Sequence, residues 1–139
     1  MKTFELFLTA ALILAAVLIV GRICRAEEEV THSTTPLKEI KKLVDDDKAW
    51  LVDCREVEEW DGGHIKDAHF LPLSRLKDMK EAPAELPKDK PIYIHCMVGG
   101  RALEAAKILK KMGYDPRPIK ANPTQLINDG GFKEALKTK

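Results

Sequence analysis

A cysteine, two glycines and an arginine lie close together in the second half of the chain and could do chemistry on a small anion. Cys96 follows a short apolar run, Ile92 to Ile94, and Gly99 and Gly100 precede Arg101. This order is typical of a strand, a tight loop and a helix, in which backbone N–H groups converge at the helix N-terminus. Such groups stabilise a thiolate and lower a cysteine pKa from about 8.5 into a range of roughly 3.5–7.5. The segment therefore predicts a reactive cysteine beside a pocket for a small anion.

The helix after Arg101 is predicted from the spacing of its apolar residues. They recur on one side of a helix, at Ala102, Ala105, Ala106, Leu109 and Met112. A buried cysteine alone is usually a small hydrophobic residue, and a glycine pair alone is usually a turn. The joint pattern of cysteine, glycines and arginine favours the functional interpretation, because glycine permits close approach of a ligand and arginine supplies charge.

Short apolar segments alternate with helical patterns elsewhere in the chain. Strands are predicted over residues 50–52, 68–71, 92–94 and 117–121, and shorter helical segments over 56–60 and 75–80. A further helix is predicted to start at Thr34-Thr35-Pro36, with a hydroxyl cap and proline in the first turn. This alternation predicts an α/β fold around a mainly parallel sheet.

Residues 1–26 have the composition of an export segment. Lys2 precedes an apolar stretch, and cleavage after Ala26 would leave a domain of residues 27–139. The protein would then be exported, to a periplasm or outside the cell. The alternative is a retained membrane anchor formed by residues 6–23, whose length is close to the lower limit for a spanning helix. Lipid modification at Cys24 is disfavoured because a large residue precedes it.

Charge and composition exclude some partners. The chain holds 23 basic and 22 acidic side chains and no long basic run, which argues against a nucleic-acid partner. The acidic run Asp45-Asp46-Asp47 is expected to be a solvated helix end and not a metal site. No metal and no cofactor are expected.

Three segments resemble the rhodanese family. Residues 51–71, LVDCREVEEWDGGHIKDAHFL, resemble its D-x-R-x-x-x-E-[YFW]-x-x-G-H-I-x-x-A segment, and CMVGGR at 96–101 resembles its active-site loop. NDGGF at 128–132 is similar to the Gly-Gly element near the end of that domain. The segments occur in the family's order over residues 30–139, so the chain is identified as a member. The resemblance implies a rhodanese-like α/β fold with a central, mainly parallel, five-stranded sheet flanked by helices.

The resemblance implies a sulfurtransferase mechanism of the thiosulfate sulfurtransferase class. Sulfane sulfur would pass from thiosulfate, a polysulfide or a small persulfide to Cys96, and from its persulfide to cyanide or to a thiol on a small molecule or a partner protein. Cys96 and Arg101 are the implied catalytic residues. The implied substrate-binding residues are those of the loop that follows the cysteine, Met97, Val98, Gly99, Gly100 and Arg101.

Four further side chains match the family's pattern or lie within it. Asp53 and Arg55 are expected to form an ion pair that fixes the loops, and His64 to fix a turn. Because strand neighbours point to opposite faces, His95 should point away from Cys96. Cys54 replaces a valine often found there, and has two interpretations: a buried core residue, or a resolving thiol for an oxidised or persulfidated Cys96.

The chain departs from the family's active loops at Met97, Val98 and Ala102, where polar residues are often found. These changes are expected to weaken the use of doubly charged thiosulfate. One alternative function is a non-enzymatic module that relays sulfur or senses redox state. Another is a phosphatase or arsenate reductase of the same fold, which uses five residues between cysteine and arginine. Four residues separate Cys96 from Arg101, which favours sulfur chemistry.

Overall fold

The computed structural model describes residues 29–81 and 83–135. The predicted export segment, residues 1–26, lies outside the described residues, so its role as signal peptide or anchor stays a prediction. Among the described residues, no helix is long and apolar enough to cross a membrane. The helices and strands follow in the order α2 (Leu37–Asp45), β1 (Trp50–Asp53), α3 (Val57–Asp61), β2 (Ala68–Phe70), α4 (Leu73–Asp78), β3 (Ile92–His95), α5 (Gly100–Lys111), β4 (Pro116–Pro118) and α6 (Pro123–Asn128).

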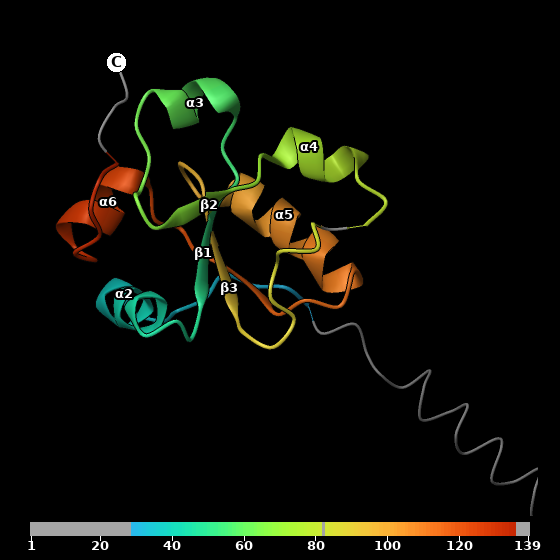
Figure 1. Ribbon diagram of the computed structural model, residues 1–139, viewed down its shortest axis with the longest axis horizontal. Coiled ribbons are helices and arrows are strands. Elements are labelled where there is room, and N and C mark those ends of the chain that lie inside the picture. The colour runs from blue at the N-terminus through green and yellow to red at the C-terminus, as the bar shows by residue number, and fades with distance from the viewer. Residues whose placement is uncertain (1–28, 82, 136–139) are drawn as a thin grey trace, which may run out of the picture.

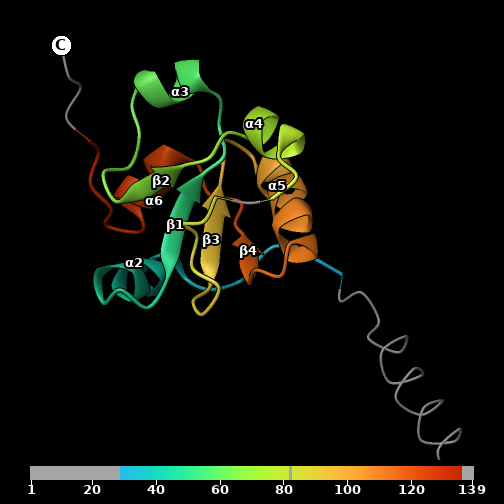
Figure 2. The same ribbon diagram turned by 45° about the vertical axis from the view of Figure 1, so that its right-hand side comes forward.

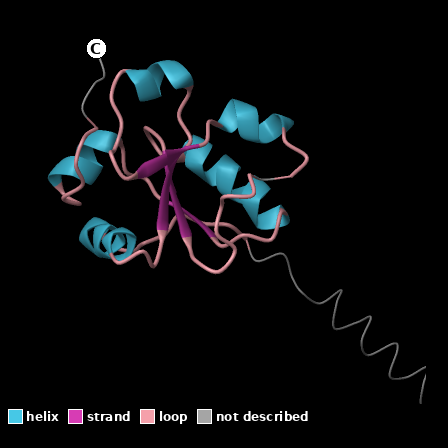
Figure 3. Cartoon of the chain, viewed as in Figure 1, coloured by secondary structure: helices cyan, strands magenta, loops and turns pink. Residues whose placement is uncertain are grey.

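The strands form one parallel sheet in the order β2-β1-β3-β4. Figure 2 shows β1, β3 and β4 side by side and running in the same direction, with α5 on one side of the sheet and α2 on the other. Helices α3 and α4 lie towards the end of the sheet at which β1 and β3 finish (Figure 1). Figure 3 shows the same arrangement as helices surrounding a central group of strands. The predicted parallel α/β fold is confirmed.

Side-chain alternation along the strands divides the core into two clusters. Val52 and Ile94 pack with the buried faces of α4 and α5. Leu51 and Tyr93 pack with buried residues of α2 and α6 on the other face. Cys96 belongs to the first cluster, so the predicted reactive residue lies on the α5 face of the sheet.

The prediction of five strands is wrong for the described residues, in which the sheet has four. Pro116 and Pro118 explain why the sheet ends at β4. The N–H of Ile119 donates to Ile94 O in β3, so the two prolines occupy the positions whose backbone groups face away from β3. Proline has no N–H to donate to a further strand. Ser33 N–H donates to Pro118 O at 2.7 Å, and the residues around Ser33 form no strand.

Most predicted element boundaries differ slightly from those observed, including a helix predicted over 75–80 that is Leu73–Asp78, and two differences have a clear physical reason. The last strand is Pro116–Pro118 instead of 117–121, because the ladder to β3 ends with the bond from Ile119. Helix α2 has Pro36 as its N-cap and no side-chain cap, so the predicted hydroxyl cap is wrong. The Thr35 hydroxyl instead accepts a hydrogen bond from Ser33 at 2.9 Å and lies 3.4 Å from the Tyr93 hydroxyl.

Candidate functional site

Cys96 lies in the loop between β3 and α5, as predicted. Gly99 is the N-cap of α5 and has a left-handed backbone with φ of 92°. A Cβ atom at Gly99 would lie 2.8 Å from His32 Nε2 and 3.0 Å from Lys120 Cγ. Only glycine therefore fits the turn that brings the start of α5 back over the cysteine.

The sulfur of Cys96 is enclosed by hydrogen-bond donors. The residue is only 1% exposed, and the Gly99 N–H donates to its Sγ at 3.1 Å. The Cys54 thiol is the donor that lowers the pKa of Cys96 most, and the backbone N–H groups of Ala102, Val98 and Gly99 add to it. These donors outweigh burial and bring the pKa of Cys96 to about 4. The predicted shift is confirmed in direction, and Cys96 is a thiolate at neutral pH.

The guanidinium of Arg101 binds a carboxylate that sequence analysis did not single out. Arg101 Nη1 donates to Glu59 Oε2 at 2.5 Å and Nη2 to Oε1 at 2.9 Å. This two-bond contact lowers the pKa of Glu59 to about 2, so the ion pair persists above that pH, including where Cys96 titrates. Arg101 therefore joins α5 to α3 instead of presenting a free charge to the predicted anion pocket. The glutamate of the matched motif was the signal for this contact.

The ion pair predicted between Asp53 and Arg55 is present. Arg55 Nε donates to Asp53 Oδ1 at 3.0 Å, and its Nη2 donates to Oδ2 at 2.6 Å. The same Nη2 donates to the carbonyl of Gly63 at 2.9 Å. Both charged side chains are buried, so the pair holds the end of β1 against the turn that follows α3.

The histidines near the site have structural positions. His64 Nδ1 is 3.0 Å from the carbonyl of Trp60, and its ring stacks on the Trp60 indole with centroids 3.6 Å apart. This matches the turn-fixing role predicted for His64. His95 Nε2 lies 3.6 Å from Asp53 Oδ2 and both side chains are fully buried, whereas Cys96 belongs to the core on the α5 face. The geometry thus gives no Cys96–His95 pair.

His32 is a second contact that sequence analysis missed. Its Nε2 donates to the carbonyl of Gly99 at 3.0 Å, although the two residues are 67 positions apart. The contact supports the outside of the Cys96 loop. His32 lies in no motif, so nothing in the sequence indicated this contact.

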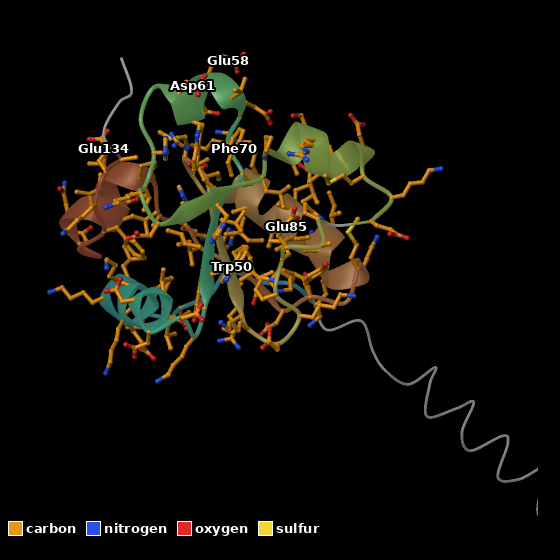
Figure 4. All side chains as sticks on the ribbon, in the orientation of Figure 1. Trp50, Glu58, Asp61, Phe70, Glu85 and Glu134 are labelled. Atoms are coloured by element: carbon orange, nitrogen blue, oxygen red, sulfur yellow. The ribbon has the colours of Figure 1, made fainter. Side chains whose placement is uncertain are left out.

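The outer surface of the loop is apolar. Met97 is 43% exposed and Val98 is 81% exposed, and they are two of the three exposed large hydrophobic residues among those described. A hollow of about 430 Å³ lies elsewhere, beside Trp50 and His69 at the start of β1 and β2. Figure 4 shows Trp50 well separated from Glu58 and Asp61, which project outward from α3. Trp50 pairs with Ile92 at the start of β3, whereas Cys96 follows the end of β3, so the hollow lies at the opposite end of the sheet from the Cys96 loop.

Comparison with known proteins places this geometry in a family. The rhodanese-like domain family matches residues 36–137, and the chain belongs to that family. The chain is 41% identical over 88 residues to YqhL of Bacillus subtilis, covering 63% of this chain and 60% of YqhL. It is 34% identical over 74 residues to a sulfurtransferase of Allochromatium vinosum, covering 53% of this chain and 66% of that protein. Both alignments thus span less than two thirds of the relative.

A solved structure shows the same fold. The human single-domain sulfurtransferase TSTD1 superposes with a TM-score of 0.59 and 26% identity, covering 70% of this chain and 98% of TSTD1. Nearly the whole of that domain is therefore matched by the α/β domain described above.

The titration of Cys96 provides a direct test of the site. The ultraviolet absorbance of the thiolate is expected to rise with a midpoint near pH 4 in the wild type. Replacing Cys54 with valine removes a hydrogen bond to a charged group, worth about 1.5–3 kcal/mol, and should raise the midpoint by about one to two pH units. Cys54→Ser keeps an O–H donor and serves as the matched control. A wild-type midpoint at or above pH 8.5 would contradict the activated thiolate.

Proposed function

We propose that the chain is a sulfurtransferase that carries sulfane sulfur as a persulfide on Cys96. The observation that carries this proposal is the Cys96 thiolate, held by backbone N–H groups at the start of α5. A thiolate is the nucleophilic form of cysteine, so the site needs no separate base at neutral pH. The sulfurtransferase names of two similar proteins support the same chemistry.

In the first half-reaction, the Cys96 thiolate attacks the outer sulfur of the donor. The sulfur–sulfur bond of the donor breaks, and the leaving group departs with the electron pair as sulfite, as a thiolate or as a polysulfide shorter by one sulfur atom. Negative charge then lies on the new outer sulfur, where the N–H groups of the loop can stabilise it as an oxyanion hole stabilises oxygen. In the second half-reaction, a thiolate or cyanide attacks that outer sulfur and restores the Cys96 thiolate.

The surface of the loop supports a choice of donor and acceptor. Met97 and Val98 expose apolar side chains beside Cys96, and neither of these two loop residues carries a charge. Polysulfides and organic persulfides carry their charge less densely than thiosulfate and can place carbon or neutral sulfur against this surface. We therefore propose that they are better donors than thiosulfate, and that the acceptor is a thiol on a small molecule or a partner protein.

Intact-mass measurement tests the proposed function. The full chain is exposed separately to thiosulfate, polysulfide and glutathione persulfide, and excess donor is removed. The wild type is expected to gain one sulfur atom, which a dithiol reductant removes, and Cys96→Ser is expected to gain none. Repeated turnover with cyanide distinguishes an enzyme from a sulfur-relay module. No gain of sulfur from any donor, or an equal gain by Cys96→Ser, would contradict the proposal.

A further inference from the structure

Cys54 and Cys96 occupy equivalent places at the ends of neighbouring strands. Asp53 and His95 are the last paired residues of β1 and β3, and each cysteine is the next residue along its chain. The Cys54 N–H donates to the carbonyl of His95 at 3.1 Å, so the pairing continues to the cysteines. Neighbouring strands lie about 4.8 Å apart. This separation falls within the range of roughly 4.4–6.8 Å that a disulfide requires between Cα atoms.

The two cysteine side chains lie on the same face of the sheet. Both belong to the core cluster that contains Val52 and Ile94 and packs against α4 and α5. The Cys54 thiol donates a hydrogen bond at 3.2 Å to the carbonyl oxygen of His95, the residue immediately before Cys96. Both cysteines are free, and Cys54 is fully buried. Cys96 is therefore the immediate neighbour with which the buried Cys54 thiol can react.

We propose that Cys54 is a resolving thiol that discharges the Cys96 persulfide when no acceptor takes its sulfur; this step rests on the proposed function. Cys54 Sγ attacks Cys96 Sγ and forms a disulfide, and the bond between Cys96 Sγ and the outer sulfur breaks. The outer sulfur leaves as hydrosulfide with that electron pair and with the proton of the Cys54 thiol. It is reduced from sulfane to sulfide, while the two cysteine sulfurs are oxidised to a disulfide. A dithiol reductant returns both thiols.

The electrostatics of the pair determine when Cys54 can react. The hydrogen bond to Cys96, burial and the charge of Cys96 hold the pKa of Cys54 far above its ordinary value. Cys54 is therefore a protonated thiol in the resting protein, placed between Cys96 and the carbonyl oxygen of His95. Persulfide formation moves the negative charge from Cys96 Sγ to the outer sulfur, one bond farther from Cys54. The inner sulfur then becomes an electrophile beside a thiol whose main cause of protonation has weakened.

The test follows the fate of a preloaded persulfide. The wild-type full chain and Cys54→Ser are loaded with excess polysulfide, freed of donor and incubated without any thiol. Intact mass, released hydrosulfide and non-reduced peptides are measured over time. The wild type is expected to exchange its gain of one sulfur atom for a loss of two hydrogen atoms, with about one hydrosulfide released per chain and a Cys54–Cys96 peptide formed. Cys54→Ser is expected to keep the added sulfur at least tenfold longer.

The outcomes separate this inference from the proposed function. If the wild type takes up sulfur but keeps it as long as Cys54→Ser, the resolving role is wrong and the sulfurtransferase stands. A peptide that links Cys96 to Cys24 instead of Cys54 also contradicts the resolving role. If neither protein takes up sulfur, the proposed function fails and this inference fails with it. If Cys54→Ser does not fold, the presence or absence of a Cys54–Cys96 peptide in the wild type still tests the resolving role.

Discussion

Gly99→Ala is expected to slow formation of the Cys96 persulfide by roughly tenfold to a hundredfold. The backbone of Gly99 is left-handed, which costs an alanine about 1–2 kcal/mol. The added Cβ would also lie 2.8 Å from His32 Nε2 and 3.3 Å from the Lys120 backbone. The loop must shift to relieve these contacts, and the hydrogen bond from Gly99 N–H to Cys96 Sγ shifts with it. A hydrogen bond to a charged group is worth about 1.5–3 kcal/mol, which corresponds to the expected loss of rate.

The measurement is the second-order rate of sulfur uptake from polysulfide at neutral pH. Gly113→Ala is the matched control, because Gly113 also has a left-handed backbone, with φ of 87°, and no atom lies within 4 Å of an added Cβ. Gly113 lies beyond the far end of α5, so its variant should lose a similar amount of stability and keep the rate of uptake. Equal rates for Gly99→Ala and the wild type would show that the turn at Gly99 does not position Cys96.

Met97→Arg is expected to raise kcat/KM for thiosulfate by about tenfold. Met97 lies next to Cys96 and is 43% exposed, so a longer charged side chain fits there without entering the core. Its guanidinium would be free to bind a dianion, whereas the guanidinium of Arg101 is held by Glu59. A charge-assisted contact of about 1.5 kcal/mol corresponds to the tenfold gain. The ratio of kcat/KM for thiosulfate to that for glutathione persulfide should rise accordingly.

Met97→Gln separates charge from polarity, because glutamine has nearly the length of methionine and no charge. Its kcat/KM for thiosulfate should stay within about twofold of the wild type, since a neutral hydrogen bond to a solvated dianion adds little. The gain of Met97→Arg should also shrink as ionic strength rises, because exposed charges are screened by salt. An unchanged kcat/KM in a folded Met97→Arg protein would mean that this side chain does not select the donor.

Local pattern was sufficient to predict the elements around Cys96. The buried run Ile92–His95 and the apolar stripe of α5 are periodic features of contiguous residues, and each appears as predicted. The left-handed turn at Gly99 is also a local feature, because φ depends on one residue and its neighbours in the sequence. The number of strands was wrong because it was taken from the family's sheet. The chain's own prolines, Pro116 and Pro118, remove the donors that a further strand on the β4 edge would need.

The sequence by itself determined which residue is the candidate nucleophile and which loop encloses it, because a strand, a glycine turn and a helix N-terminus arise from consecutive residues. Only the tertiary structure decided what surrounds that residue. Glu59 holds Arg101 across 42 positions, and His32 supports Gly99 across 67. Cys54 reaches Cys96 only because β1 pairs with β3 in one register. These contacts join segments far apart in the chain, and their geometry follows from how the sheet and helices pack and not from any local pattern.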